Sequence, residues 1–282
     1  MTRLWIPPLS LTECTRGLMV RSTVGVPLLP TQRFNHYPAT PLCSISWWFS
    51  GEVEMLTAGQ PVSLEAVRSA VPARCAFSGP HTRPTVSWSS GEAHGMMLLL
   101  LPDAVQQLTG IDPGHWTNTL VDVAEVLPVP WQQFCKDVSA AHNDDERIRR
   151  IEAFLSPLWR TARPARALGA NRYSDWVQGL ALRAATSHVG RGVRQIERRI
   201  RLWAGMPMRE LRGFGRAERM FFAAMAIADG QKPKWSELAV ETGYSDQSHL
   251  CRESRRITGC TPEELLHRIA SDEGFWPYRI WQ

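Results

Sequence analysis

The segment from Glu237 to Leu266, ELAVETGYSDQSHLCRESRRITGCTPEELL, restricts the fold of this chain more than any other stretch of its sequence. Its helical pattern breaks once, at Gly243, a residue type that adopts the left-handed conformation in which helices commonly end. The pattern then restarts with a stripe of small and apolar residues at Leu250, Ser254 and Ile257. This spacing places the stripe on one face of a second helix. The segment therefore predicts two short helices joined by a tight turn, a helix-turn-helix.

The starts of these two helices and the outward face of the second one are polar. We expect Ser236 to cap the first helix and Ser245 or Asp246 to cap the second, because Ser and Asp side chains accept hydrogen bonds from free backbone N–H groups. The outward face of the second helix includes Gln247 and Arg252. Such a face is commonly no more than a solvated helix surface. Gln and Arg are also the side chains that make paired hydrogen bonds with adenine and guanine in the major groove of DNA.

The positive charge of the chain is concentrated just upstream of this segment. Between Arg191 and Arg219 there are nine arginines and three glutamates, a net charge of +6, whereas the whole chain carries +5. A local excess of this kind is typical of proteins that bind a polyanion. The charge pattern therefore favours a surface that contacts nucleic acid.

The segment resembles the second helix-turn-helix of AraC-type (AraC/XylS) transcription regulators. The resemblance consists of a Gly-aromatic pair, an acidic-Gln-Ser turn, an Arg five residues after that Gln and a final Gly-x-x-Pro: Gly243-Tyr244, Asp246-Gln247-Ser248, Arg252 and Gly259-Cys260-Thr261-Pro262. Upstream, GVRQIERRIRLWAGMPMREL is similar to the first helix-turn-helix of the same family. Residues 208–228 would form the connecting helix, with Met220, Phe221, Ala224 and Ile227 on its inner stripe. Three features depart from the family pattern: Gly192 replaces a capping Ser, Ser254 replaces a buried Phe, and the Gly-x-x-Pro of the first unit is shortened to Gly205-Met206-Pro207.

The resemblance implies a sequence-specific DNA-binding transcription regulator, an activator acting with RNA polymerase, and not an enzyme. Its two recognition helices would enter successive major grooves of double-stranded DNA, about 34 Å apart. The side chains expected at base edges are Arg194, Gln195, Arg198, Gln247, Ser248 and Arg252. The side chains expected at phosphates, where contacts position the protein without reading sequence, are Arg191, Arg199, Arg209, Arg212 and Arg256.

The N-terminal part of the chain is predicted to form β structure followed by helices. Short segments between Pro- and Gly-rich turns, such as Leu18–Val24, Cys43–Phe49 and Met96–Leu101, are typical of a small barrel or sandwich. From Pro102 onward the pattern becomes helical. We therefore predict an α+β protein. Its parts would be a β-rich sensor or dimerisation domain with C-terminal helices over residues 1–160, a linker over 161–175, and an all-α DNA-binding domain with two helix-turn-helix units over 176–282.

The N-terminal domain is also where the family usually binds a small-molecule effector or forms a homodimer. The side chains that could line an effector cavity are Trp47, Trp48, His81, Arg83 and Trp88. Arg83 would suit an anionic effector. The alternative is that the tryptophans are core residues and that His81 and Arg83 belong to a turn at Gly79-Pro80.

Two other functions stay open on the sequence. An enzyme that transfers an alkyl group from DNA would need a reactive cysteine, for which Cys251 beside Arg252 is the candidate. A ligand-binding or scaffold protein with a degenerate helix-turn-helix would account for Gly192 and Ser254.

Metal-ligand spacings, cofactor motifs, a signal peptide and a membrane-length apolar run are not found in the sequence. We expect no metal, no cofactor, no membrane partner and a cytoplasmic location. The aromatic C-terminal segment DEGFWPYRIWQ is expected to dock on the second helix-turn-helix or across a dimer interface, because free aromatic side chains at this density would be insoluble.

Overall fold

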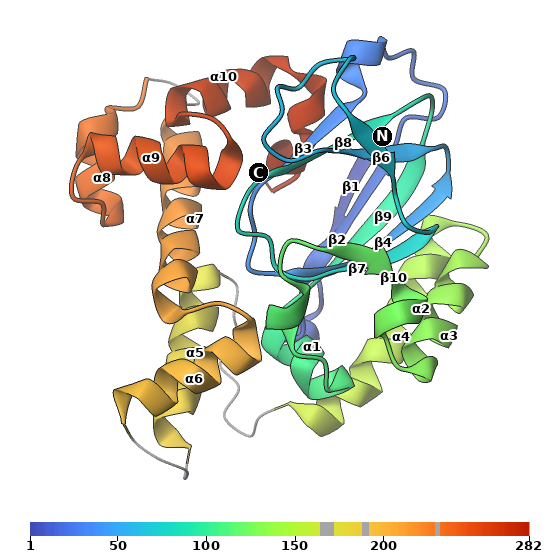
Figure 1. Ribbon diagram of the computed structural model, residues 1–282, viewed down its shortest axis with the longest axis horizontal. Helices are drawn as coiled ribbons and strands as arrows, with labels where there is room; N and C mark the ends of the chain where they lie inside the picture. The colour runs from blue at the N-terminus through green and yellow to red at the C-terminus, as the bar shows by residue number, and fades with distance from the viewer. Residues whose placement is uncertain (164–171, 188–191, 229–231, 282) are drawn as a thin grey trace.

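A computed structural model describes residues 1–163, 172–187, 192–228 and 232–281 of the chain. The architecture is α+β, with a β-rich N-terminal region followed by helices (Figure 1). The strands form two antiparallel sheets. The six-stranded sheet has the order β1-β2-β9-β4-β7-β10, and the four-stranded sheet has the order β3-β8-β5-β6.

The bounds of the elements follow the chain. The strands are β1 Thr2–Trp5, β2 Thr15–Ser22, β3 Phe34–Tyr37, β4 Cys43–Ser50, β5 Val53–Leu56, β6 Arg68–Ala70, β7 Cys75–Ser78, β8 Thr85–Ser89, β9 His94–Leu100 and β10 Leu120–Asp122. The α-helices are α1 Pro102–Thr109, α2 Val123–Val126, α3 Val129–Ser139, α4 Asp144–Ala162, α5 Tyr173–Thr186, α6 Val193–Ala204, α7 Met208–Ala228, α8 Trp235–Thr242, α9 Gln247–Thr258, α10 Pro262–Ser271 and α11 Trp276–Arg279. The 3-10 helices are η1 Leu9–Leu11, η2 Pro30–Gln32, η3 Pro113–Trp116 and η4 Glu273–Phe275.

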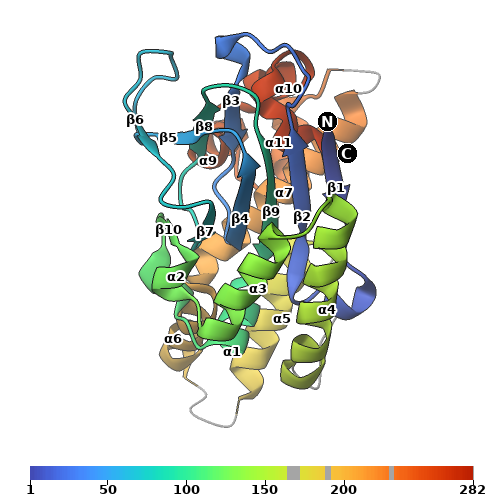
Figure 2. The same cartoon turned by 90° about the vertical axis from the view of Figure 1, so that its right-hand side faces the viewer.

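Strand β4 shows how the larger sheet separates a helix-covered face from an inner face. Successive side chains of a strand point to opposite sides. Trp47 faces α3, where its indole N–H donates to the carbonyl oxygen of Cys135 at 3.1 Å and its ring meets Phe134 edge-on. Ser44 and Ser46 point to the other side, toward the four-stranded sheet. In Figure 2, α3 and α4 lie in front of the larger sheet, on the face that Trp47 occupies.

The main strands and helices were predictable from the sequence. The strands expected at Leu18–Val24, Cys43–Phe49 and Met96–Leu101 are confirmed as β2, β4 and β9, with ends shifted by at most three residues. The helix expected over residues 208–228 is confirmed as α7. Helix α4 runs to Ala162 and α5 begins at Tyr173, while most of the expected linker, residues 164–171, lies outside the described residues.

The C-terminal helices are arranged along α7, with α5 and α6 at one end and α8 and α9 at the other (Figure 1). Gly243 ends α8 with a φ of 89°, as the break in the sequence predicts, and Leu250, Ser254 and Ile257 of α9 are buried as expected. Ser254 is accommodated in the core because its hydroxyl donates to the carbonyl oxygen of Cys260 at 2.8 Å. A serine can therefore occupy a buried position on α9 without an unpaired polar group.

Two local expectations about the C-terminal helices were wrong. Lys234, not Ser236, occupies the N-cap of α8, because the helix begins at Trp235. Ile227, expected on the inner stripe of α7 with Met220, Phe221 and Ala224, is 37% exposed at the end of the helix. Met220 and Ala224 are buried as expected, and Phe221 is half-buried.

The aromatic C-terminal segment docks on the N-terminal region of the same chain. Phe275 is fully buried and stacks on His36 of β3 with ring centroids 4.4 Å apart. The indole N–H of Trp276 donates to the Asn35 side chain at 2.8 Å. Gly274 passes so close to β3 that a Cβ there would lie 2.7 Å from the Phe34 carbonyl oxygen. The expectation of docking is confirmed, but the main docking surface is β3 and not the α8–α9 pair.

Candidate functional site

Helix α9 presents a polar, exposed first turn that is fixed by a local hydrogen-bond network. Asp246 is its N-cap, and Oδ1 of this residue accepts the backbone N–H of His249 at 2.7 Å. This hydrogen bond is the main reason why the pKa of Asp246 is lowered. The Ser245 hydroxyl lies 3.1 Å from Nδ1 of His249, and the His249 ring meets Tyr244 edge-on. The start of α9 is thereby held in one conformation.

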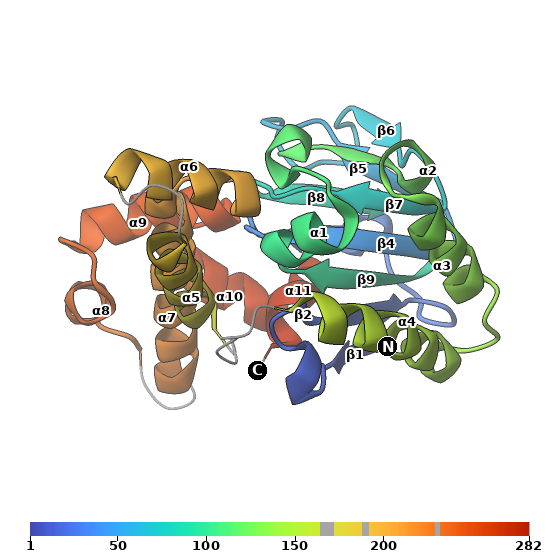
Figure 3. The ribbon, with the colours of Figure 1, turned by 90° about the horizontal axis from the view of Figure 1, so that it is seen from below.

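The three side chains expected to read bases from α9 are all exposed, namely Gln247, Ser248 and Arg252. The corresponding three on α6 are exposed as well, namely Arg194, Gln195 and Arg198. Helix α6 begins differently, because its N-cap Gly192 has no side chain with which to cap it. In Figure 3, α6 and α9 run in similar directions and lie toward the same side of α7. The two helices that carry the six candidate base contacts thus lie toward one side of α7 (Figure 3).

The candidate phosphate contacts fall into two groups. Arg209 and Arg212 of α7 are exposed. Arg256 and Arg199 already have partners in the protein: Arg256 forms an ion pair with Glu253 at 3.1 Å, and Arg199 donates to the carbonyl oxygen of Ala184 at 2.8 Å. Arg191 lies outside the described residues. A phosphate contact by Arg256 would have to compete with a carboxylate, whereas Arg209 and Arg212 can meet a phosphate directly.

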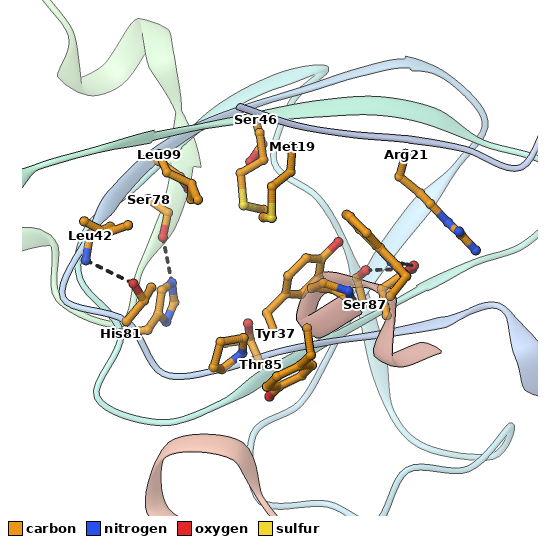
Figure 4. Close-up of a pocket in the computed structure, with 18 of the residues that line it drawn as sticks. Met19, Arg21, Tyr37, Leu42, Ser46, Ser78, His81, Thr85, Ser87 and Leu99 are labelled. Atoms are coloured by element: carbon orange, nitrogen blue, oxygen red, sulfur yellow. Dashed lines mark hydrogen bonds between the residues drawn. The ribbon is translucent and has the colours of Figure 1, made fainter. Parts of the chain in front are cut away.

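A cavity of about 300 Å³ lies between the two sheets and reaches the C-terminal helices (Figure 4). The larger sheet contributes Met19, Arg21, Ser44, Ser46, Ser78 and Leu99, and the smaller sheet contributes Asn35, Tyr37, Thr85 and Ser87. The C-terminal region contributes Phe214, Glu218, Phe221, Ile257, Trp276 and Tyr278. The cavity is therefore enclosed jointly by the β-rich region, by α7 and α9, and by the aromatic C-terminal segment.

The structure brings only some of the predicted effector-pocket residues to this cavity. Trp48 and His81 line it, and Trp47 borders it although its ring points to α3 on the other face of β4. Arg83 does not line it and is exposed. Trp88 also lies elsewhere, because its indole N–H donates to the carbonyl oxygen of Pro30 at 3.0 Å and its outer face carries the guanidinium of Arg68 at 4.3 Å. The expected role of Arg83 as the anchor of an anionic ligand in this cavity is therefore wrong.

Polar side chains at the ends of the cavity are already paired within the protein. Nε2 of His81 lies 2.6 Å from the Ser78 hydroxyl, and burial lowers the pKa of His81 to about 4, so the ring is neutral at pH 7. Arg16 and Glu218 form an ion pair at 2.7 Å, and burial of Glu218 raises its pKa despite that partner. The sequence did not indicate Ser44 and Ser46 as cavity residues, although the alternation of small polar and large apolar residues in CSISWW was the signal for a two-faced strand.

Three cysteines of the chain are poorly suited to nucleophilic chemistry, whereas Cys251, the candidate for alkyl transfer, is half-buried on α9. Burial raises the pKa of Cys14, Cys43 and Cys260, which disfavours the thiolate needed for alkyl transfer. Within the described ranges, no three His, Cys, Asp or Glu side chains gather as metal ligands would. None of the described helices combines the length and the hydropathy that spanning a bilayer requires.

Comparison with known proteins yields distant structural similarities. No protein-family model and no curated protein matches the chain. The structure is similar to an apo variant of ToxT from Vibrio cholerae strain SCE256, with 12% sequence identity and a TM-score of 0.40 over 89% of this chain and 97% of that chain. It is also similar to ToxT from Vibrio cholerae O395, with 14% identity and a TM-score of 0.38 over 85% and 95% of the two chains. A further crystal form of Vibrio cholerae ToxT gives 13% identity and a TM-score of 0.37 over 89% and 97%. Similarity this distant leaves the binding partners of the chain to be argued from its own residues.

Proposed function

We propose that this chain is a sequence-specific DNA-binding transcription regulator of the AraC type. In this proposal, residues 1–160 form the sensor domain, residues 161–175 form the linker and residues 176–282 form the DNA-binding domain. The pairs α5–α6 and α8–α9 act as two helix-turn-helix units on double-stranded DNA, and an effector in the cavity between the sheets controls them. The regulator would act on RNA polymerase, alone or as a homodimer.

One observation carries the proposal: two helix starts on one side of α7 expose hydrogen-bonding side chains that have no partner among the described residues. Within the described residues, none of the side chains of Arg194, Gln195, Arg198, Gln247, Ser248 and Arg252 forms a hydrogen bond or an ion pair with another residue. Arg and Gln are the side chains that commonly contact phosphates and base edges in protein–DNA complexes. Arg209 and Arg212 on the connecting helix α7 add positive charge beside them.

The test is retention of genomic DNA fragments by the purified full chain, followed by titration of the selected fragment and its scrambled version at several salt concentrations. We expect the selected fragment to bind at least about a thousandfold more tightly than the scrambled one, and binding of both to weaken as salt rises. Equal retention of both fragments at moderate salt would refute the proposal. Arg149→Ala is the matched control, because Arg149 is an exposed arginine on α4, far from the helix pairs, and its loss should leave both affinities unchanged.

A further inference from the structure

Two buried polar atoms that have no hydrogen-bond partner among the described residues lie together where α7 meets the turn between α8 and α9. They are Nε of Arg216 on α7 and the hydroxyl of Tyr244, which follows the last turn of α8. Tyr244 is 4% exposed, and its ring centroid lies 5.6 Å from the guanidinium carbon of Arg216. Because buried polar groups in proteins almost always have partners, this pair points to a group that binds here.

Guanidinium groups from α7 and α9 meet beside this pair, next to a residue that has no side chain. A Cβ added at Gly213 of α7 would lie 3.9 Å from Nη2 of Arg216 and 3.5 Å from Nη2 of Arg256. The same point would lie 3.2 Å from Oε2 of Glu253. The two arginines and the glutamate therefore surround one small volume.

The Tyr244 hydroxyl lies within electrostatic range of these charges and of a third arginine. Its pKa is raised to about 12, chiefly by burial and then by Glu253, while three arginines oppose the rise: Arg216, Arg219 and Arg256. The hydroxyl therefore stays protonated at neutral pH and can donate a hydrogen bond. Three guanidinium groups and one carboxylate give this cluster a net charge of +2.

The single carboxylate of the cluster serves one arginine and leaves the others available. The two oxygens of Glu253 accept from Nε and Nη2 of Arg256 at 3.1 and 3.2 Å. Arg219 makes one long hydrogen bond, to the carbonyl oxygen of Thr242 at 3.4 Å. Within the described part of the chain, Arg216 forms neither a hydrogen bond nor an ion pair. An oxyanion is the group that would complete such a cluster, because its oxygens accept from several guanidinium N–H groups at once.

The position of the cluster suits a ligand that arrives from solvent between the two helix pairs. Arg219 and Gly243 are exposed, and Arg216 is half-buried. Arg216 lies near the middle of α7, and α6 and α9 lie toward the same side of that helix (Figure 3). If these two helices enter successive major grooves, the DNA backbone between the grooves passes this part of α7.

We propose that Arg216, Arg219 and Tyr244 bind one phosphate group, with Arg256 held beside it by Glu253. Either the DNA backbone or a free phosphate supplies this chemistry, and the experiment separates the two sources. The DNA source rests on the proposed function, whereas binding of inorganic phosphate is independent of it.

The first measurement is thermal unfolding of the full chain in sodium phosphate and in sodium chloride of equal ionic strength. We expect phosphate to raise the unfolding midpoint in a saturable way, because a ligand that binds the folded state stabilises it. Arg216→Gln should abolish the saturable rise. Tyr244→Phe keeps the ring and should need about tenfold more phosphate for the same rise, as expected for the loss of a hydrogen bond to a charged group.

Arg149→Gln and Tyr278→Phe are the matched controls. Arg149 is an exposed arginine on α4, and Tyr278 is a buried tyrosine whose hydroxyl also lacks a partner among the described residues. Both variants should respond to phosphate as the native chain does. The general stabilising effect of phosphate as a salt acts on all these proteins alike and cancels from the comparison.

The second measurement is titration of scrambled duplex DNA at several salt concentrations. Arg216→Gln should reduce the salt slope by about 1 if a backbone phosphate fills the site, and Tyr244→Phe should weaken binding about tenfold without changing the slope. Unchanged duplex binding together with a lost response to inorganic phosphate would identify a free phosphate as the ligand. If either variant left both probes unaffected, the inference would be overturned. Phosphate effects as expected, without preference for a selected DNA fragment, would contradict the regulator function and keep the phosphate site.

Discussion

The two helix pairs are attached to the β-rich region in different ways. The α5–α6 pair is joined to it through a buried carboxylate, Asp103 of α1, which is 6% exposed. Asp103 accepts the indole N–H of Trp176 at 2.8 Å and forms an ion pair with Arg183, both on α5. Gly205, at the end of α6, packs so tightly on η3 that a Cβ there would lie 2.9 Å from the Gly114 nitrogen. This pair is fixed directly to the body of the protein.

The α8–α9 pair has a longer and more varied attachment. One backbone hydrogen bond joins it directly, from the N–H of Ala39 to the carbonyl oxygen of Ile257 in α9 at 2.7 Å. Other contacts are indirect. Helix α7 contributes the ion pair between Glu218 and Arg16, and the aromatic C-terminal segment packs on β3. The cavity lies at this second attachment, since Ile257 and Tyr278 both line it.

The two candidate recognition helices are held in place by different features. Helix α9 has its own side-chain cap at Asp246, and its contact with the β-rich region borders a cavity. Helix α6 starts at the uncapped Gly192, but its partner helix α5 is anchored by a buried ion pair. We therefore expect an effector to change the position of α9 more than that of α6.

The largest effect on stability should come from removing the ring of Phe275, which holds the aromatic C-terminal segment on β3. Phe275→Ala deletes a fully buried ring that stacks on His36, and we expect it to lower the free energy of unfolding by about 4 kcal/mol. Urea unfolding of the full chain measures this loss. Phe275→Leu, which keeps most of the apolar volume, should cost less than about 1.5 kcal/mol. Equal losses in the two variants would show that the ring is not a packing anchor.

The attachment of the α5–α6 pair to the β-rich region should be weakened by a change at Asp103. Asp103→Asn leaves Arg183 without its carboxylate, and we expect a loss of roughly 3 kcal/mol in the same unfolding experiment. Asp175→Asn is the matched control, because Asp175 is an exposed aspartate on the same helix, α5, and its change should cost less than about 0.5 kcal/mol. Similar losses of stability in both variants would show that the ion pair between Asp103 and Arg183 does not anchor the α5–α6 pair.

The packing of the aromatic C-terminal segment on β3 should also make the stability of the protein depend on pH. Burial lowers the pKa of His36 to about 4, against the influence of Asp272, which raises it. Between pH 6.5 and 4 the unfolded chain binds a proton at this histidine and the folded chain does not, so stability falls as pH falls through that window. We expect His36 to account for roughly 2 kcal/mol of this fall.

His36→Phe keeps the stack on Phe275 and removes the titration, so the difference in stability between the variant and the native chain should grow in favour of the variant from pH 7 to pH 4. His81, whose pKa is also about 4, remains in both proteins and cancels from the comparison. Parallel stability profiles over this range would contradict the assignment to His36.

The side chains proposed to contact DNA should differ in their effects on binding. Arg252→Ala on α9 is expected to weaken binding to the selected fragment by about 1–3 kcal/mol and to relax preference at one base pair. Arg209→Ala on α7 should weaken binding to selected and scrambled DNA alike and reduce the salt slope by about 1. Gel-shift titrations over a range of salt test both. Equal effects of the two variants on both DNAs would count against this division.

The sequence predicts local features of the fold. It does not predict which distant segments pack together. The stop at Gly243 and the buried stripe from Leu250 follow from helix geometry within a few residues, so the pattern alone indicates them. The hydrogen bond between Asn35 and Trp276 joins residues 241 positions apart, and no local pattern marks it. The aromatic density of the segment predicted that it must dock, but not where.

The same distinction applies to the candidate site. The exposure of Arg252 follows from its position opposite the buried stripe, whereas Gln247 is exposed because it is the first residue of α9. The place of Ser44 and Ser46 in a cavity wall depends on the smaller sheet lying across the larger one, which the sequence of β4 does not specify. The pair Glu253–Arg256 was within reach of the sequence, because residues three apart on a helix are neighbours.

The most direct test of the central claim, that α6 and α9 read DNA together, is a hydroxyl-radical footprint of the full chain on its selected fragment. We expect two protected tracts on one face of the duplex, about one helical turn apart. Arg198→Ala should weaken protection of one tract, and Arg252→Ala should weaken protection of the other. A single protected tract, or loss of the same tract in both variants, would contradict the account.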